Sequence, residues 1–560
     1  MLNGYKTITD AARYYFIFSY LHSARMQKIN QNTMYYKKGT LTCKIISIAF
    51  VVFMFCTPVK FYAQVSQNKI VYQQPVFADT ARLQKIMAAM PVIDGIFKDY
   101  ATKSHYPGFA YGIVVDGKLV HTGYTGYDDI EKKAEVNSQS AFRIASMTKS
   151  FTAMAILKLR DEGKLKLDDP VYLYIPEMKN QPYPTRDAAP ATIRELLSHA
   201  AGFPEDNPWG DRQLADSDAQ MIAMIKKGLS FSNDPGGNYE YSNMGFAMLG
   251  YIIKKVSGKT YEQYINENIL APLGMKNTYW EYAKVPAPQL AHGYRWLNSN
   301  WVEQPLLHDG TYGAMGGMIT TIEDFSKYVS FHLSAWPPND SEETGPVKRS
   351  SVREMQQPWN ISGFYPQNKY PSGRACPTVS AYCYGLGWTK DCEGRIMVAH
   401  TGGLPGFGSN WRILPDYGIG VISFANLTYA NAGYINLEVL DTLITMAGLK
   451  PRQLVTSSIL TQRRDELVRL LPNWNNAEAT GIFAQNFFMD YFPDSLRKEA
   501  TAIFNKAGKI NAIKDVAPEN GLRGSFIMEG ENSNIQVSFT LTPENPPLIQ
   551  AYSIKEVAKK

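Results

Sequence analysis

Apolar residues recur along the chain at two spacings, one typical of strands and one typical of helices. Residues 109–115 and 118–124 predict two strands joined by Asp116-Gly117, a dipeptide typical of a two-residue hairpin turn. From residue 146 to 159 the apolar positions change to helical spacing. We therefore expect a sheet edge at the start of a large domain, followed by a buried helix.

The middle of the chain combines helices with long polar loops, and strands return before residue 450. Residues 243–256 predict a second apolar helix. Because strands at both ends enclose a helical middle, we expect an α/β (α+β) domain over residues 80–450 whose sheet is closed by its own two ends. The later strands are predicted over residues 384–388, 395–400, 410–414 and 418–425.

A smaller unit follows the large domain. Residues 451–473 predict a linker helix, and residues 474–560 predict a small C-terminal α+β domain. This domain contains no cluster of Ser, His, Asp or Cys that suggests chemistry. Its expected elements are a helix over residues 477–506 and strands over residues 510–516, 522–529 and 535–542.

Composition and charge narrow the choice of function. The 560 residues are 45% apolar and 19% charged, as in globular proteins with a full core. The formal charge of +6 comes from residues 1–64, which hold eight of the 57 Lys and Arg and one of the 51 acids. The rest carries 49 bases against 50 acids, so we expect no nucleic-acid partner.

The basic N-terminal stretch resembles a signal peptide. Lys37, Lys38 and Lys44 precede an apolar run over residues 45–56, and Ala63 supplies a small residue near a cleavage point. The run is shorter than the ~20 residues that span a bilayer. We therefore interpret residues 1–64 as a leader, with translation starting at Met34, and expect a periplasmic or extracellular protein. The alternative is an uncleaved leader that anchors the chain to the membrane.

Cysteines and histidines give no metal-ligand pattern. Cys376, Cys383 and Cys392 remain after the leader, and an exported protein would form one disulfide among them, with the pairing left open. The eight histidines are scattered and no His-Glu-x-x-His motif is present. We expect neither a metal nor another cofactor.

Ser146-Met147-Thr148-Lys149 could supply a nucleophile and its base. Residues i and i+3 share one face of a helix, and a serine at a helix N-terminus lies among free N–H groups. A lysine desolvated by the apolar helix would have a lowered pKa and could accept the serine proton. The same spacing occurs at Ser66–Lys69 and Ser495–Lys498, so the apolar surroundings distinguish Ser146.

Two further motifs lie at the ends of predicted elements, one at the start of a helix and one after a strand. Tyr241-Ser242-Asn243 begins the second apolar helix, where a phenol could relay a proton and an amide could hold a substrate amide. His400-Thr401-Gly402-Gly403 follows a predicted strand, where glycines let a substrate backbone approach. The Gly403 N–H could complete an oxyanion hole with that of Ser146. Matches of similar spacing without this context occur at His121, Tyr264, Tyr429 and Tyr434.

In this order the motifs resemble the serine β-lactamase and penicillin-binding-protein superfamily, specifically its class C β-lactamase-like branch. The resemblance covers about residues 85–450. It implies an antiparallel five-stranded sheet flanked by helices, beside an all-helical region. It further implies an acyl-enzyme on Ser146, proton transfer by Lys149 and Tyr241, and substrate binding by Asn243, His400, Thr401, Gly402 and Gly403. Supporting segments are Leu196–Phe203, Ala271–Met275, Gly316–Met318 and Tyr384–Trp388.

One departure affects the expected substrate. Typical β-lactamases have lysine where His400 stands, whereas histidine resembles D-Ala-D-Ala carboxypeptidases, D-aminopeptidases and related esterases. A cationic His400 would hold a substrate carboxylate. In that case kcat/KM for acidic substrates would fall as the pH rises from about 6 to 8. His199 is interpreted as structural.

The leading hypothesis is an exported serine hydrolase that cleaves an amide or ester. It covers D-amino-acid peptidases, esterases and β-lactamases, acting on small molecules or on peptide or ester substrates such as cell-wall peptides. The alternative is a non-catalytic or slowly acylating penicillin-binding-type sensor or binding protein. The oligomeric state stays open.

Overall fold

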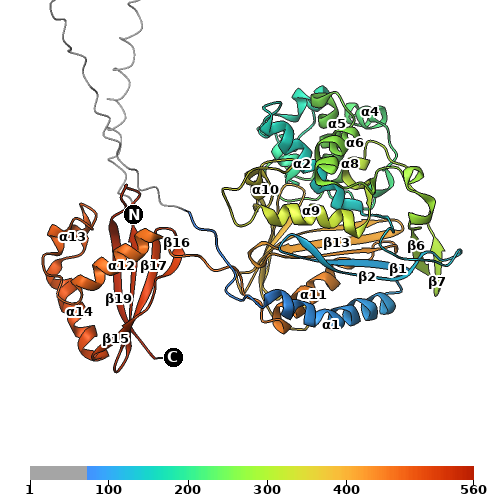
Figure 1. Ribbon diagram of the computed structural model, residues 1–560. Coiled ribbons are helices and arrows are strands. Elements are labelled where there is room, and N and C mark those ends of the chain that lie inside the picture. The colour runs from blue at the N-terminus through green and yellow to red at the C-terminus, as the bar shows by residue number, and fades with distance from the viewer. Residues whose placement is uncertain (1–71, 560) are drawn as a thin grey trace, which may run out of the picture. The chain divides into compact units, whose positions relative to one another are not determined.

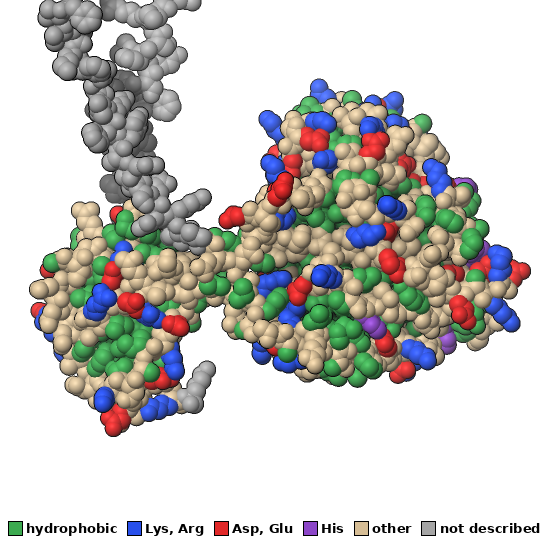
Figure 2. All heavy atoms as spheres, viewed as in Figure 1, with side chains coloured by type: hydrophobic (Ala, Val, Ile, Leu, Met, Phe, Trp, Pro, Cys, Tyr) green, Lys and Arg blue, Asp and Glu red, His purple; other side chains and the backbone are tan. Residues whose placement is uncertain are grey.

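The computed structural model describes residues 72–559. The expected leader, its start at Met34 and the Ser66–Lys69 match lie outside these residues. Within them, no helix combines the length and the apolar character needed to cross a membrane. Figure 2 shows acidic and basic side chains interspersed over the visible face, in agreement with the balanced charge of the chain after residue 64.

A nine-stranded antiparallel sheet organises the large domain, in the order β3-β2-β1-β14-β13-β12-β11-β10-β9. β1 pairs with β14, so the two ends of the domain close the sheet as expected, although β1 is an interior strand and not an edge. The strands are β1 Gly108–Val115, β2 Lys118–Asp129, β3 Ala134–Glu135, β9 Asn360–Tyr365, β10 Thr378–Tyr382, β11 Gly387–Asp391, β12 Ile396–Leu404, β13 Phe407–Leu414 and β14 Ile419–Ala425.

The mixed α/β fold is confirmed, but the sheet has nine strands where five were expected. The hairpin of β9 and β10, together with β11, extends it beyond β12. A disulfide joins Cys376, just before β10, to Cys392, just after β11, and Cys383 is a buried free thiol. The bridge therefore fastens the extension. The strand expected at residues 384–388 begins later, at Gly387, because Gly385 turns the chain with φ 66°.

Helices cover both faces of the sheet (Figure 1). α1 (Arg82–Lys103) and α11 (Ala432–Met446) pack on one face, and α9 (Ile322–Ser334) packs on the other. All residues of β1 and β14 are consequently buried. The sequence did not predict α1, since Pro91 and Gly95 interrupt its apolar pattern.

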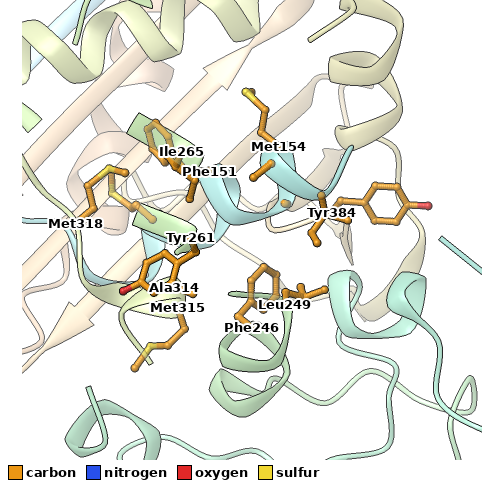
Figure 3. Packing of buried hydrophobic residues seen from close by; sticks show 14 of the residues in the cluster. Phe151, Met154, Phe246, Leu249, Tyr261, Ile265, Ala314, Met315, Met318 and Tyr384 are labelled. Carbon is orange, nitrogen blue, oxygen red and sulfur yellow. The ribbon is translucent and has the colours of Figure 1, made fainter. Parts of the chain in front are cut away.

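The helical region places α2 (Thr148–Asp161) against α5 (Asn243–Ser257) and α8 (Gly313–Gly316). Figure 3 shows Phe151 and Met154 of α2 packed with Phe246 and Leu249 of α5 and Met315 of α8. α5 approaches α8 closely, because a Cβ on Gly250 would lie 2.4 Å from that of Ala314. This packing buries the start of α2, where the expected nucleophile lies. Smaller elements are α3 Ile193–Leu197, α4 Asp218–Lys226, α6 Tyr261–Ile265, α7 Ala271–Leu273, α10 Arg349–Met355, β4 Phe142–Arg143, β5 Thr278–Tyr279, β6 Tyr294–Leu297, β7 Asn300–Glu303 and β8 Ile319–Thr320.

The C-terminal domain is α+β, as expected. The linker helix α12 covers Ser458–Leu470. The single helix expected over residues 477–506 is wrong: the chain forms a 3-10 turn (Ala477–Thr480), the short α13 (Phe487–Asp490) and then α14 (Pro493–Ala507). Gly481 has φ 69°, and Pro493 disfavours helix at Phe492 before it. An antiparallel sheet holds β15 Ile510–Ile513, β16 Ala517–Asn520, β17 Arg523–Gly530, β18 Asn534–Leu541 and β19 Ile549–Val557.

Candidate active site

Ser146 lies in a single turn of 3-10 helix, Ala145–Met147, that leads directly into α2. Its side chain opens onto the cleft although the residue is only 7% exposed. Ala145 has φ 50°, a conformation that costs free energy for a residue with a Cβ. The chain therefore turns sharply immediately before Ser146.

Lys149 is fully buried, and each of its three possible N–H bonds has an acceptor. Its Nζ lies 2.9 Å from Ser146 Oγ, 2.7 Å from Asn243 Oδ1 and 3.0 Å from the Met315 carbonyl oxygen. Burial lowers the pKa of Lys149 to about 7, although the charges of Asp211 and Asp206 oppose this shift. When neutral, the amine can donate to Asn243 and Met315 and still accept the Ser146 proton.

Tyr241 lies above the lysine, with its ring centroid 4.9 Å from Lys149 Nζ. Burial raises the pKa of Tyr241 well above its usual value, and a hydrogen bond with Ser146 opposes this shift only in part. The phenol therefore stays protonated at neutral pH. It can donate or relay a proton but does not serve as the initial base.

Asn243 contacts the lysine and does not face the cleft. Its Oδ1 accepts from Lys149 Nζ, and its Nδ2 donates to Asn207 Oδ1 at 2.5 Å. The residue is fully buried. Each end of its amide already has one partner, Lys149 at the oxygen and Asn207 at the nitrogen, so its role in holding a substrate amide stays a prediction. The structure assigns Asn243 to positioning Lys149, and Asp206 fixes its backbone by accepting from its N–H at 2.7 Å.

His400 is held in its neutral form. Its Nδ1 donates to the Thr401 carbonyl oxygen at 2.7 Å, and its Nε2 accepts from the Tyr382 hydroxyl at 2.8 Å. Burial, with a smaller effect from the charge of Lys149, lowers the pKa of His400 to about 3. This environment disfavours the cationic His400 expected to hold a substrate carboxylate, and with it the expected fall in kcat/KM as the pH rises from about 6 to 8.

Thr401, Gly402 and Gly403 form the end of β12 beside the nucleophile. β11 pairs with β12 only as far as Ala399, so no strand covers the outer edge of residues 401–403 within residues 72–559. Thr401 is exposed there, and its Oγ1 accepts from Asn410 Nδ2 at 3.0 Å. A Cβ on Gly402 would lie 2.1 Å from the Ile144 carbonyl oxygen, so glycine is required for β12 to approach the turn before Ser146.

A cleft of about 740 Å³ brings these groups together. Ser146, Tyr241, His400, Thr401 and Gly403 line it, whereas Lys149, Asn243 and Gly402 lie behind its wall. Trp388, from the segment Tyr384–Trp388, also lines the cleft. The remaining lining residues include several that the sequence analysis did not identify, from a loop, from the sheet extension and from β13: Glu205, Asn207, Asp211, Tyr239, Tyr382 and Arg412. Only spatial contact reveals these residues, since none belongs to a motif.

The residues set aside as matches without context fall mostly elsewhere. His121 lies on β2 and contacts Asp94, and Ser495 and Lys498 lie on α14 of the C-terminal domain. Tyr429 is different, because it lines the cleft and donates to Asp211 Oδ2 at 3.1 Å. Among residues 72–559 no group of His, Cys, Asp and Glu could hold a metal ion.

His199 lies outside the cleft lining and supports the start of α5. Its Nδ1 accepts from the Ser242 backbone N–H at 3.1 Å, and its ring centroid lies 4.3 Å from those of both Tyr241 and Tyr382. Burial lowers its pKa well below the usual value.

Comparisons with known proteins show what the chain is similar to. The family model described as Beta-lactamase matches residues 93–444. Protein flp of Staphylococcus aureus (strain MW2) is 30% identical over 376 residues, which cover 67% of this chain and 70% of that protein. Beta-lactamase-like protein 2 of Dictyostelium discoideum is 32% identical over 499 residues, covering 82% and 84%.

Two solved structures share the fold. The octameric penicillin-binding protein homologue from Pyrococcus abyssi has a TM-score of 0.53 and 23% identity, covering 84% of this chain and 96% of its own. A class C beta-lactamase has a TM-score of 0.51 and 20% identity, covering 64% and 96%.

Proposed function

The chain belongs to the beta-lactamase family, whose relatives support a serine hydrolase-type function, and from this premise we propose that it cleaves an amide or ester through an acyl-enzyme on Ser146. One observation carries the proposal: a fully buried lysine amine lies 2.9 Å from the Ser146 hydroxyl. With its pKa lowered to about 7, Lys149 is neutral in a large share of molecules at neutral pH and can accept the proton.

The acylation step uses the groups in a fixed order. Lys149 takes the Ser146 proton while Oγ forms a bond to the substrate carbonyl carbon. The backbone N–H groups of Ser146 and Gly403 stabilise the oxyanion. The C–N or C–O bond then breaks, and the leaving atom receives a proton through Tyr241, which regains one from Lys149. Water hydrolyses the ester by the same transfers in reverse and releases the acid.

The substrate that this cleft favours is a peptide or ester of small size. The neutral His400 differs from the permanent cation that lysine provides in typical β-lactamases, which supports a D-amino-acid peptidase or esterase over a β-lactamase. Export to the periplasm or outside the cell is part of the proposal and rests on the leader pattern in residues 1–64.

A second candidate is a penicillin-binding-type sensor that acylates slowly or binds without reaction. It shares the nucleophile but lacks efficient deacylation. The lysine base and the protonated tyrosine beside Ser146 favour the enzyme over a protein that binds without reaction, which needs neither, whereas a slowly acylating sensor differs from the enzyme only in turnover.

Intact-protein mass spectrometry tests the proposal. The protein is incubated with a fluorophosphonate or with benzylpenicillin, and turnover of p-nitrophenyl acetate is followed in parallel. We expect one adduct on the wild type, none on Ser146→Ala, and an unchanged adduct on Ser495→Ala, which removes the other described Ser-x-x-Lys serine. Labelling of Ser146→Ala would contradict the proposal. A stable adduct without turnover of any substrate would favour the sensor.

A further inference from the structure

Asp211 is a buried carboxylate in the cleft wall whose hydrogen bonds are incomplete. It lies in a single turn of 3-10 helix, Gly210–Arg212, and is only 2% exposed, although it lines the cleft. Its Oδ2 accepts a hydrogen bond from the Tyr429 hydroxyl at 3.1 Å. Its Oδ1 is buried and has no hydrogen-bond partner among the described residues. Because a carboxylate has about four acceptor sites, Asp211 can still accept from a ligand.

The surroundings of Asp211 favour a positive charge beside it. Burial raises the pKa of Asp211, and the positive charge of Lys149 opposes this shift without a hydrogen bond between the two residues. The neighbouring carboxylates of Glu205 and Asp206 add negative charge to the same loop. A buried carboxylate without a cation in contact is costly, and such groups in a cleft are candidates for ligand binding.

Tyr429 reaches Asp211 from the sheet side of the cleft. It follows β14, lines the cleft and is 43% exposed. Its φ is 54°, a conformation that costs free energy for a residue with a Cβ. A phenol that donates to Asp211 can still accept a hydrogen bond from a third group. Since backbone strain gathers at functional sites, the strained Tyr429 points to a function for its hydroxyl.

The pair formed by Asp211 and Tyr429 lies beside the groups that act on the scissile carbonyl. A Cβ on Gly210 would lie 2.7 Å from Asn243 Cβ, so the turn that carries Asp211 packs on the residue that positions Lys149. A Cβ on Gly403 would lie 2.9 Å from Tyr429 Cδ1, so the ring of Tyr429 covers the residue that supplies the proposed oxyanion N–H. In an aminoacyl substrate only one carbon separates the amine from the carbonyl carbon. Its amine must therefore lie next to the oxyanion site, as this pair does.

We propose that Asp211 and Tyr429 bind a protonated amine on the acyl group of the substrate, so that the enzyme prefers aminoacyl amides or esters with a free amine. The ammonium donates to the Asp211 carboxylate and to the Tyr429 hydroxyl oxygen, and the first of these is a charge-assisted hydrogen bond. The inference rests on the proposed function only in treating the ligand as a substrate. Binding itself does not depend on reaction at Ser146.

The test therefore measures binding in a protein that cannot react. Ser146→Ala is titrated calorimetrically at pH 7 with D-alanine p-nitroanilide and with N-acetyl-D-alanine p-nitroanilide, which differ only at the amine. An α-amino group has a pKa of about 7.7–8.0, so the free amine is mostly protonated at this pH. We expect the free amine to bind about 10- to 100-fold more tightly than the acetylated one. This preference should weaken with added salt.

Substitutions added to Ser146→Ala assign the preference to residues. Asp211→Asn should reduce the ratio of affinities to near one, because an amide has the size of the carboxylate but no charge. Tyr429→Phe should retain part of the ratio, because the carboxylate remains. Glu205→Gln is the matched control, since it removes the same charge from the cleft lining. Glu205 is exposed and its carboxylate already accepts from the Asn207 N–H at 3.1 Å, so the preference should survive this change.

Equal binding of the two anilides, binding of neither, or an unchanged preference in Asp211→Asn would overturn the inference. An equal loss in Glu205→Gln would overturn it too, because the overall charge of the cleft would then set the preference. Thermal unfolding checks that Asp211→Asn is folded. If it is not, Tyr429→Phe decides, and an unchanged ratio in that variant would overturn the inference.

These results are independent of the labelling experiment. Loss of labelling selectivity for Ser146 would refute the proposed function, whereas absence of the amine preference would refute only the role of Asp211 and Tyr429.

Discussion

Raising the pH from 6 to 8 should increase kcat/KM about tenfold, because Lys149 acts in its neutral form. With the pKa of Lys149 at about 7, about one tenth of the amine is neutral at pH 6 and about nine tenths at pH 8. kcat/KM reports groups of the free enzyme, which is the state that the structure describes. His400 adds no change in this range, since its pKa is about 3.

p-Nitrophenyl acetate suits this measurement because it carries no ionisable group between pH 6 and 8. Initial rates are taken at low substrate concentration, with spontaneous hydrolysis subtracted at each pH. The Asp211→Asn variant supplies a second, directional check. The Asp211 carboxylate raises the pKa of Lys149, so its removal should move the midpoint of the profile to lower pH.

A rate that is flat or falls between pH 6 and 8 would refute this reasoning. It would mean that the Ser146 proton goes to another group or that Lys149 stays charged. A midpoint that moves to higher pH in Asp211→Asn would show that another effect governs the lysine. Either result would remove the basis for Lys149 as the base.

Two substitutions test how the site is held together. Gly402→Ala should slow labelling of Ser146 and lower stability by about 1–3 kcal/mol, because the added Cβ would lie 2.1 Å from the Ile144 carbonyl oxygen. Gly95→Ala is the control, because a Cβ there would have no atom within 4 Å. Equal effects of the two substitutions in thermal unfolding would contradict the packing argument. Asn243→Ala should slow labelling and move the pH midpoint lower, because the Lys149 ammonium loses an acceptor 2.7 Å away; an unchanged pH–rate profile would show that Asn243 does not position the lysine.

The sequence predicted the nucleophile and its base because the two residues are close along the chain. Ser146 lies in the 3-10 turn that leads into α2 and Lys149 lies in the first turn of α2, so a separation of three residues brings them together. Tyr241 and His400 are distant in sequence, and only the order of motifs and the family resemblance indicated that they meet the nucleophile. The charge of His400 was not predictable, because it depends on burial and on the Tyr382 hydroxyl from β10.

Asp211 is a residue of the site that the sequence did not predict. Asp211 lies in a loop without a readable pattern, and its proximity to Lys149 depends on how that loop packs. In the fold, the expected closure of the sheet was right because β1 and β14 are both strongly apolar, whereas α1 was missed because Pro91 and Gly95 weaken its helical pattern.

The alternation of side chains along β12 and β13 decides which residues lie close to the base. His400 is opposite Trp411, and Ala399 is opposite Arg412, so His400 and Arg412 point to opposite faces of the sheet. The charge of Lys149 already lowers the pKa of His400, which shows that the two groups interact. A lysine at position 400 would therefore place a permanent cation close to Lys149 and lower its pKa further. With neutral histidine there, burial and the carboxylates of Asp211 and Asp206 set the pKa of Lys149.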